Sequence, residues 1–226
     1  MRRMVRAALV LVLVLAGACV PVVTHGPRVE PGFSLGVSAG VDAHAFAPQN
    51  DPLFLPVNWS WPVQYGWRAP GDTGVAVLVG VNVPGPAVIG TPLLVLSEGD
   101  VFVQLPSRPG AMQRGVGVLG SAYHVMPYVQ LGRERSGAKG WYTTQGVVWL
   151  REIPQGDDFG REPGVAWMPA LAAYDGGRFI TATGYLQGGL GLQRERRCVQ
   201  DGCEASLLPF WALGGGVTVQ LHGARR

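Results

Sequence analysis

Two cysteines near the C-terminal end have the type and spacing that most clearly predict chemistry. Cys198 and Cys203 enclose four residues, Val-Gln-Asp-Gly, and the Asp-Gly pair among them favours a tight turn. In an exported chain, which meets an oxidising compartment, such a pair is expected to form a disulfide. The alternative is half of a metal site, but no second Cys or His pair lies nearby. We therefore expect a Cys198–Cys203 disulfide that stiffens a loop tip, and no metal site.

A third cysteine, Cys19, follows a segment with the composition of an export signal. Residues 1–6 carry three arginines, residues 7–15 are apolar, and Ala-Gly-Ala occupies positions 16–18. A positive start, a short apolar run and small residues before a cut are typical of a secretory signal peptide. The apolar run is too short to be a membrane-spanning anchor. Residues 1–18 are therefore predicted to be a signal peptide.

The residues before Cys19 also resemble the lipobox of bacterial lipoproteins. This resemblance implies that Cys19 is acylated, with palmitate among its chains, and becomes the first residue of the mature protein. Ala-Gly-Ala at 16–18 equally fits the site of ordinary signal peptidase, so plain secretion is the alternative. Residues 19–32 are expected to form a tether to the domain that follows.

Residues with catalytic potential are few and scattered. The four histidines, His25, His44, His124 and His222, form no pair with zinc-ligand spacing. Ser121 and His124 lie three residues apart at an expected turn, which makes an acyl hydrolase conceivable. That chemistry also needs an orienting carboxylate and an oxyanion hole, and no spacing in the sequence identifies them. We therefore expect no catalytic residue, no cofactor and no enzymatic activity, with a lipid-modifying enzyme as a minor alternative.

Composition and charge exclude several classes of protein. Hydrophobic residues make up 47 % of the 226 residues and charged residues 15 %, which is too apolar for a disordered charged tail. The 34 glycines and 18 prolines argue against a helical domain. The formal net charge of +3 equals the three arginines of the leader, so the rest of the chain is neutral. No basic surface remains for a nucleic acid.

From residue 33 onward, apolar residues alternate with small or polar ones. The odd positions of 57–67 are Val, Trp, Trp, Val, Tyr and Trp, and those of 75–83 are all Val. Successive side chains of a strand point to opposite faces, so each segment has one apolar face. Strands of about ten residues are typical of membrane barrels, whereas soluble strands usually have five or six. The pattern predicts strands at 33–42, 57–68, 75–83, 100–106, 112–121, 124–133, 141–150, 165–174, 178–193 and 206–221.

The segments between these strands alternate in length and carry most of the charges. Long connections are expected at 43–57, 84–99, 151–164 and 194–205, and short ones at 69–72, 107–111 and 175–177. Long loops on one rim and tight turns on the other are typical of outer-membrane barrels. The stretches near 121–123 and 134–140 depart from this rule. The tryptophans fall near strand ends, as they do in interfacial girdles.

The body of the chain resembles the small outer-membrane β-barrel proteins of Gram-negative bacteria in general. The resemblance implies an all-β fold, an antiparallel up-and-down barrel of about ten strands (8–12) over residues 33–226. It also implies that the barrel wall contacts membrane lipid, that the N-terminus is periplasmic, and that the role is structural or interactive. The alternative is a lipid-anchored periplasmic barrel or sandwich that binds an apolar ligand or a protein. A soluble domain would show the same alternation with its apolar face turned inward.

Overall fold

A computed structural model describes residues 23–46, 57–70, 74–84, 97–108, 110–122, 124–135, 139–151, 163–177, 179–199 and 202–223. These residues form ten strands. Their bounds are β1 (Gly32–Phe46), β2 (Val57–Arg68), β3 (Ala76–Pro84), β4 (Glu98–Leu105), β5 (Gln113–Gly120), β6 (His124–Glu134), β7 (Lys139–Leu150), β8 (Gly164–Gly176), β9 (Ile180–Val199) and β10 (Gly202–His222). Among the residues described, no helix has the length and apolar character needed to cross a membrane.

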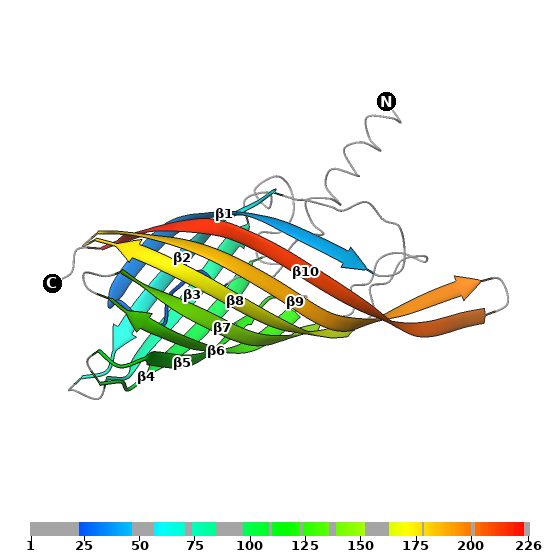
Figure 1. Cartoon of the computed structure of the whole chain (residues 1–226), viewed down its shortest axis with the longest axis horizontal. Coiled ribbons are helices and arrows are strands. Elements are labelled where there is room, and N and C mark those ends of the chain that lie inside the picture. Colours follow the sequence, from blue (N-terminus) through cyan, green and yellow to red (C-terminus); the bar gives the residue numbers. More distant parts are fainter. Residues whose placement is uncertain are drawn as a thin grey trace, which may run out of the picture.

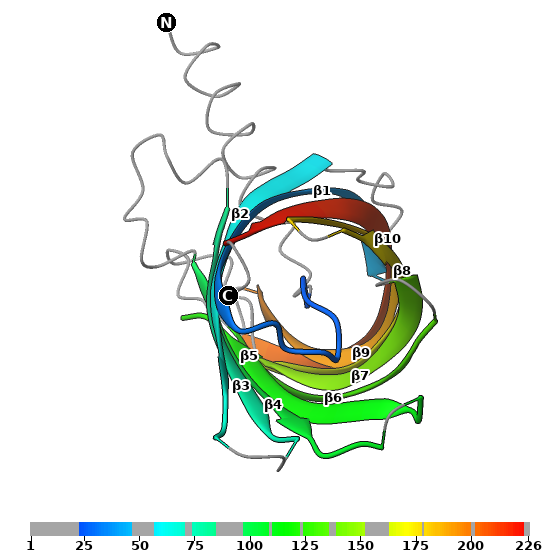
Figure 2. The same ribbon diagram turned by 90° about the vertical axis from the view of Figure 1, so that its left-hand side faces the viewer.

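The ten strands form one closed antiparallel barrel (Figures 1 and 2). Each strand pairs with its neighbours in sequence, and β1 closes the ring by pairing with β10 from Ser34↔His222 to Phe46↔Phe210. Closure leaves no strand edge exposed along the wall. The predicted fold class is therefore confirmed, and the strands lie within a few residues of the ranges expected from alternation.

The connections define two rims. The short-turn rim carries residues 69–75, 106–112, 135–138 and 177–179. The stretch near 134–140 was expected to depart from the alternation of long and short connections. It is an ordinary short connection, because β6 ends at Glu134 and β7 begins at Lys139. The opposite, long-loop rim carries residues 47–56, 85–97 and 151–163. Two connections on that side are short: the three residues after β5, at 121–123, and the two residues between β9 and β10, at 200–201.

The expected long loop at 194–205 is wrong, because these residues continue β9 and β10. The two strands are 20 and 21 residues long and stay paired from Val199↔Gly202 down to the barrel. The ladder to β8 ends at Gln193, and the ladder to β1 ends at Phe210. A two-stranded ribbon therefore projects beyond the wall (Figure 1). The charged residues at 194–204 do not prevent the two strands from pairing there.

Burial decides which face of the alternation points inward. On β3, Ala76 and Leu78 are buried, whereas Val79 and Val81 are 53 % and 44 % exposed. On β10, Thr218 and Gln220 are buried, whereas Val217 and Leu221 are exposed. Apolar residues thus face outward and small or polar residues face the lumen. This polarity is the reverse of a soluble barrel.

Inward-facing glycines make room for large side chains of neighbouring strands. A Cβ atom at Gly117 would overlap the ring of Tyr128, and one at Gly115 would overlap Phe102. A Cβ at Gly146 would lie 2.7 Å from the sulfur of Met126. These three large side chains belong to the buried apolar cluster of the lumen. These glycines therefore mark positions where a large side chain of a neighbouring strand approaches the backbone closely.

Candidate functional site: a filled lumen inside an apolar wall

The N-terminal residues 23–31 lie inside the barrel. In Figure 2 this segment is the deep-blue coil within the ring of strands. Val29 is fully buried, and Thr24 and His25 are 5 % and 3 % exposed. At Gly32 the backbone φ is 103°, a value that favours glycine, and there the chain turns from the lumen into β1. Part of the expected tether, residues 19–32, therefore fills the lumen.

Two wall glycines accommodate this segment. A Cβ atom at Gly66 of β2 would collide with the carbonyl of Glu30 and lie 2.9 Å from a methyl of Val29. A Cβ at Gly132 of β6 would lie 2.7 Å from the ring of Pro27. The backbone of the segment thus contacts the wall where the wall has no side chain.

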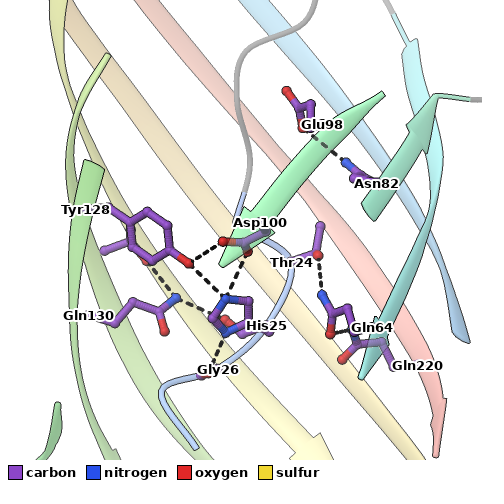
Figure 3. A network of polar contacts seen from close by, with 11 residues as sticks. Thr24, His25, Gly26, Gln64, Asn82, Glu98, Asp100, Tyr128, Gln130 and Gln220 are labelled. Atoms are coloured by element: carbon purple, nitrogen blue, oxygen red, sulfur yellow. Dashed lines mark hydrogen bonds and ion pairs between the residues drawn. The ribbon is translucent and has the colours of Figure 1, made fainter. Parts of the chain in front are cut away.

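His25 is held by polar groups from two strands (Figure 3). Its Nε2 lies 3.0 Å from Asp100 Oδ2 and 3.0 Å from the Tyr128 hydroxyl. Tyr128 in turn donates to Asp100 Oδ1 at 2.7 Å. The His25 Nδ1 lies 2.8 Å from the Gly26 carbonyl oxygen. All three side chains are buried, so each depends on the others for its polar contacts.

Further hydrogen bonds join the segment to the wall along its length. The Val29 backbone N–H donates to Gln104 Oε1 at 2.8 Å. Gln130 Nε2 donates to the His25 carbonyl oxygen at 3.0 Å. Gln64 Nε2 donates to Thr24 Oγ1 at 3.0 Å, as Figure 3 also shows. Buried polar side chains on β2, β4 and β6 therefore satisfy the polar groups of residues 24–29.

Arg28 forms the charged contacts of the lumen segment, with Glu134 at the end of β6 and with Glu30. Its Nη1 donates to both carboxylate oxygens of Glu134, at 2.8 and 2.6 Å, and its Nε lies 3.2 Å from Glu30. Burial alone would lower the pKa of Arg28. The hydrogen bond to Glu134 and the charges of Glu30 and Glu134 outweigh that effect and raise the pKa. The guanidinium therefore stays charged inside the barrel.

A second polar cluster lies on β4 and β6, near the long-loop rim. His124 Nε2 is 3.3 Å from Glu98 Oε1, and Asn82 Nδ2 donates to Glu98 Oε2 at 3.3 Å. Ser121 Oγ lies 3.0 Å from His124 Nδ1, so the structure supplies the carboxylate that spacing did not identify. The Ser121 backbone N–H also donates to the His124 carbonyl at 2.9 Å. We interpret the Ser121–His124 contact as part of this tight turn.

The outer wall carries aromatic side chains in two rows, each 40–57 % exposed. One row, near the long-loop rim, comprises Trp59, Trp149, Trp167 and Trp211; the other, near the short-turn rim, comprises Phe33, Tyr65, Trp67 and Phe179. Between them the exposed side chains are mostly Val and Leu. Trp59 and Trp67 are eight residues apart on β2, about 27 Å along the strand and roughly 20 Å along the axis of a tilted barrel. An apolar band between aromatic girdles is typical of membrane-spanning barrels.

The strand register places Cys198 directly opposite Cys203, so the two cysteines of the predicted disulfide are paired residues of β9 and β10. The disulfide itself stays a prediction. Cys19 lies outside the described residues, so its acylation also stays a prediction. Within the described ranges, no cluster of three metal-ligating side chains occurs.

The connection expected at 84–99 would include Glu98, and this expectation is wrong, because β4 begins at Glu98 and continues through Asp100. Both carboxylates lie on β4 and point into the lumen. Their spacing of two residues could have indicated that both carboxylates lie on the same face of one strand, because alternate residues of a strand share a face. Their partners come from segments 16 to 75 residues away in sequence, which no local pattern reveals.

No protein-family model matches the chain, and no curated protein matches its sequence. Among solved structures the chain is similar to Neisserial surface protein A, with 8 % identity and a TM-score of 0.38 over 83 % of this chain and 96 % of that one. It is also similar to an outer membrane channel from Pseudomonas putida F1 (10 % identity, TM-score 0.35, 84 % and 97 % covered) and to the NanC porin (11 %, 0.33, 78 % and 98 %). Likenesses this weak carry no inference about function, which therefore rests on the chain's own residues.

Proposed function

We propose that the protein is an outer-membrane β-barrel lipoprotein with a structural or interaction role. The observation that carries this proposal is the outward apolar band between two rows of aromatic side chains. More than thirty large apolar side chains are exposed on the wall and its rims, far more than a soluble monomer presents in one contiguous surface. The predicted signal peptide and acylated Cys19 account for export and provide a second attachment to the membrane.

The filled lumen argues against a role in bulk transport. Ten strands leave a narrow interior, and residues 23–31 occupy it with buried side chains and hydrogen bonds to the wall. We infer that the protein acts through its rims and its projecting ribbon. In the proposed orientation the long-loop rim faces outward from the cell and the short-turn rim faces the periplasm.

The need for detergent separates this proposal from a lipid-anchored soluble domain. Replacing Cys19 with Ala removes the predicted lipid attachment and leaves the wall unchanged. We expect the variant to stay with the membrane fraction, to require detergent for extraction, and to migrate faster on a gel when unheated. A variant that is released into buffer as a folded protein would show that the wall is not membrane-spanning.

Single cysteines test the orientation of the same barrel. In a background without native cysteines, Val79→Cys lies on the apolar wall, Arg151→Cys on the long-loop rim and Lys139→Cys on the short-turn rim. A membrane-impermeant maleimide should label position 151 in intact cells and position 139 only after the outer membrane is opened. Position 79 should resist labelling in both. Labelling at 79 as fast as at 151 would contradict the membrane assignment.

A further inference from the structure

A pocket of about 560 Å³ opens at the short-turn rim, where Arg68 and Gly74 lie near Ser107 and Gln113. Four arginines line it, Arg28, Arg68, Arg108 and Arg135, with Glu134 as the acidic residue. The pocket lies at the mouth of the lumen, because Arg68 directly follows the outward-facing Trp67 on β2 and so points to the opposite side of the wall. Its volume is in the range of small-molecule sites.

The charges in this pocket do not balance. Glu134 already accepts two hydrogen bonds from Arg28 and one, at 3.2 Å, from Gln113. Arg68, Arg108 and Arg135 form no ion pair with any residue that the structure describes. At the same rim, Lys139 is paired with Asp175 at 2.8 Å. Among the described residues, three guanidinium groups therefore line the pocket with no carboxylate paired to them.

We propose that this pocket binds a small soluble anion that carries several charged oxygens, as phosphates and polycarboxylates do. A guanidinium presents a planar fork of N–H donors that matches two oxygens of such a group. Like charges that share a pocket repel one another, and an anion between them removes that repulsion. The position at the lumen mouth, away from the lipid-facing side of β2, favours a dissolved anion over a lipid headgroup.

Calorimetric titration of the Cys19→Ala protein in a non-ionic detergent tests the site, with inorganic pyrophosphate and citrate as probes. We expect one binding site whose affinity falls as salt is added, because partly exposed charges are screened. Each of Arg68→Gln, Arg108→Gln and Arg135→Gln should weaken binding roughly fivefold, the upper value for an exposed ion pair. The double variant Arg68→Gln/Arg108→Gln should weaken it by more than tenfold.

A matched control comes from the same rim. Arg114 and Arg133 are exposed on the strands β5 and β6 and do not line the pocket, so Arg114→Gln/Arg133→Gln changes the net charge equally. This control should bind both probes as the parent does. Equal loss in the two double variants would overturn the proposal in favour of general charge attraction, and the absence of binding by the parent would overturn it outright.

Nanodiscs distinguish the source of the anion. Pyrophosphate affinity should be the same in phosphatidylcholine discs with and without phosphatidylglycerol. If phosphatidylglycerol suppresses pyrophosphate binding, the occupant is a lipid headgroup and the proposal of a soluble ligand is wrong. The assignment of the pocket to the periplasmic side and the choice of a dissolved anion over a lipid headgroup rest on the proposed function, whereas anion binding itself does not. A barrel that requires detergent but binds neither probe refutes this inference alone, and a barrel that needs no detergent refutes the membrane role alone.

Discussion

The outer and inner faces of the same strands follow different rules. On the outer face, exposed residues such as Val79 and Val81 would all contact lipid hydrocarbon in the proposed membrane barrel, so each position needs only to be apolar. On the inner face, Asp100 on β4, Tyr128 on β6 and His25 of the lumen segment must meet within 3.0 Å of one another. Tolerance to substitution should therefore depend on polarity outside and on individual partners inside.

The largest effect is expected from Asp100→Ala. This change leaves His25 and Tyr128 buried without their shared partner, which should lower the free energy of unfolding by about 3–5 kcal/mol. Asp175→Ala breaks the Lys139–Asp175 pair, whose two side chains are both more than 60 % exposed, so its cost should stay below about 1 kcal/mol. Urea unfolding in detergent micelles measures both, and equal losses would contradict the distinction between lumen and surface.

The sequence predicted the strands because their signal is local. Alternation along 57–67 or 75–83 is visible in a single segment, and ten such segments imply a barrel. It was harder to predict which face of the strands points inward, because a soluble barrel shows the same alternation of apolar and polar residues. Residue size could have indicated the inward face. Gly40, Gly80 and Gly216 lie on the polar face, and small residues fit the inner side of a closed sheet, where there is less room.

The lumen was not predicted, because its contacts join distant parts of the chain. The bond from Val29 to Gln104 spans 75 residues, and that from Gln130 to the His25 carbonyl spans 105. Residues 23–31 have neither alternation nor helical periodicity, so a tether was the natural interpretation. The same limit applies to the arginine pocket, which gathers residues from four separate segments.

A charge on the outer face should have the next largest effect. Val79→Arg places a guanidinium in the apolar band and should cost about 2–4 kcal/mol. Val79→Leu keeps the position apolar and should change stability by less than about 1.5 kcal/mol. Unfolding in lipid vesicles, where the surrounding hydrocarbon is present, is the appropriate measurement. A near-neutral Val79→Arg would show that lipid does not cover this row.

A methyl group at Gly66 should loosen the lumen segment. Gly66→Ala forces the backbone at Val29 and Glu30 away from β2, and overpacking of this kind costs about 1–3 kcal/mol. Gly184→Ala is the matched control, because a Cβ there meets no atom within 4 Å. We expect the Gly66 variant to show a higher ion conductance in planar bilayers than the control. Equal conductance in both would indicate that the segment does not seal the lumen.

The smallest effect on the barrel is expected from breaking the predicted Cys198–Cys203 disulfide. Residues 195–199 of β9 pair only with residues 202–206 of β10 beyond the wall, so reduction should leave the unfolding of the barrel unchanged. It should speed proteolysis of the ribbon, since the hairpin tip loses its cross-link. Maleimide labelling of both thiols in denatured protein that was never reduced would show that the disulfide does not form.

The position of the lumen segment also constrains the order of assembly. The wall becomes a ring only when β1 meets β10, and that seam joins residues as far apart as Ser34 and His222. Residues 23–31 are continuous with β1 through Gly32, so they arrive at the seam with the strand that closes it. Pairing β1 with β10 closes the longest loop in the fold and is therefore its most costly loop closure. The buried contacts of residues 23–31 with β2, β4 and β6 hold β1 at one edge of the open sheet before β10 pairs with it. The segment that fills the finished barrel is thus also placed to guide its last strand pairing.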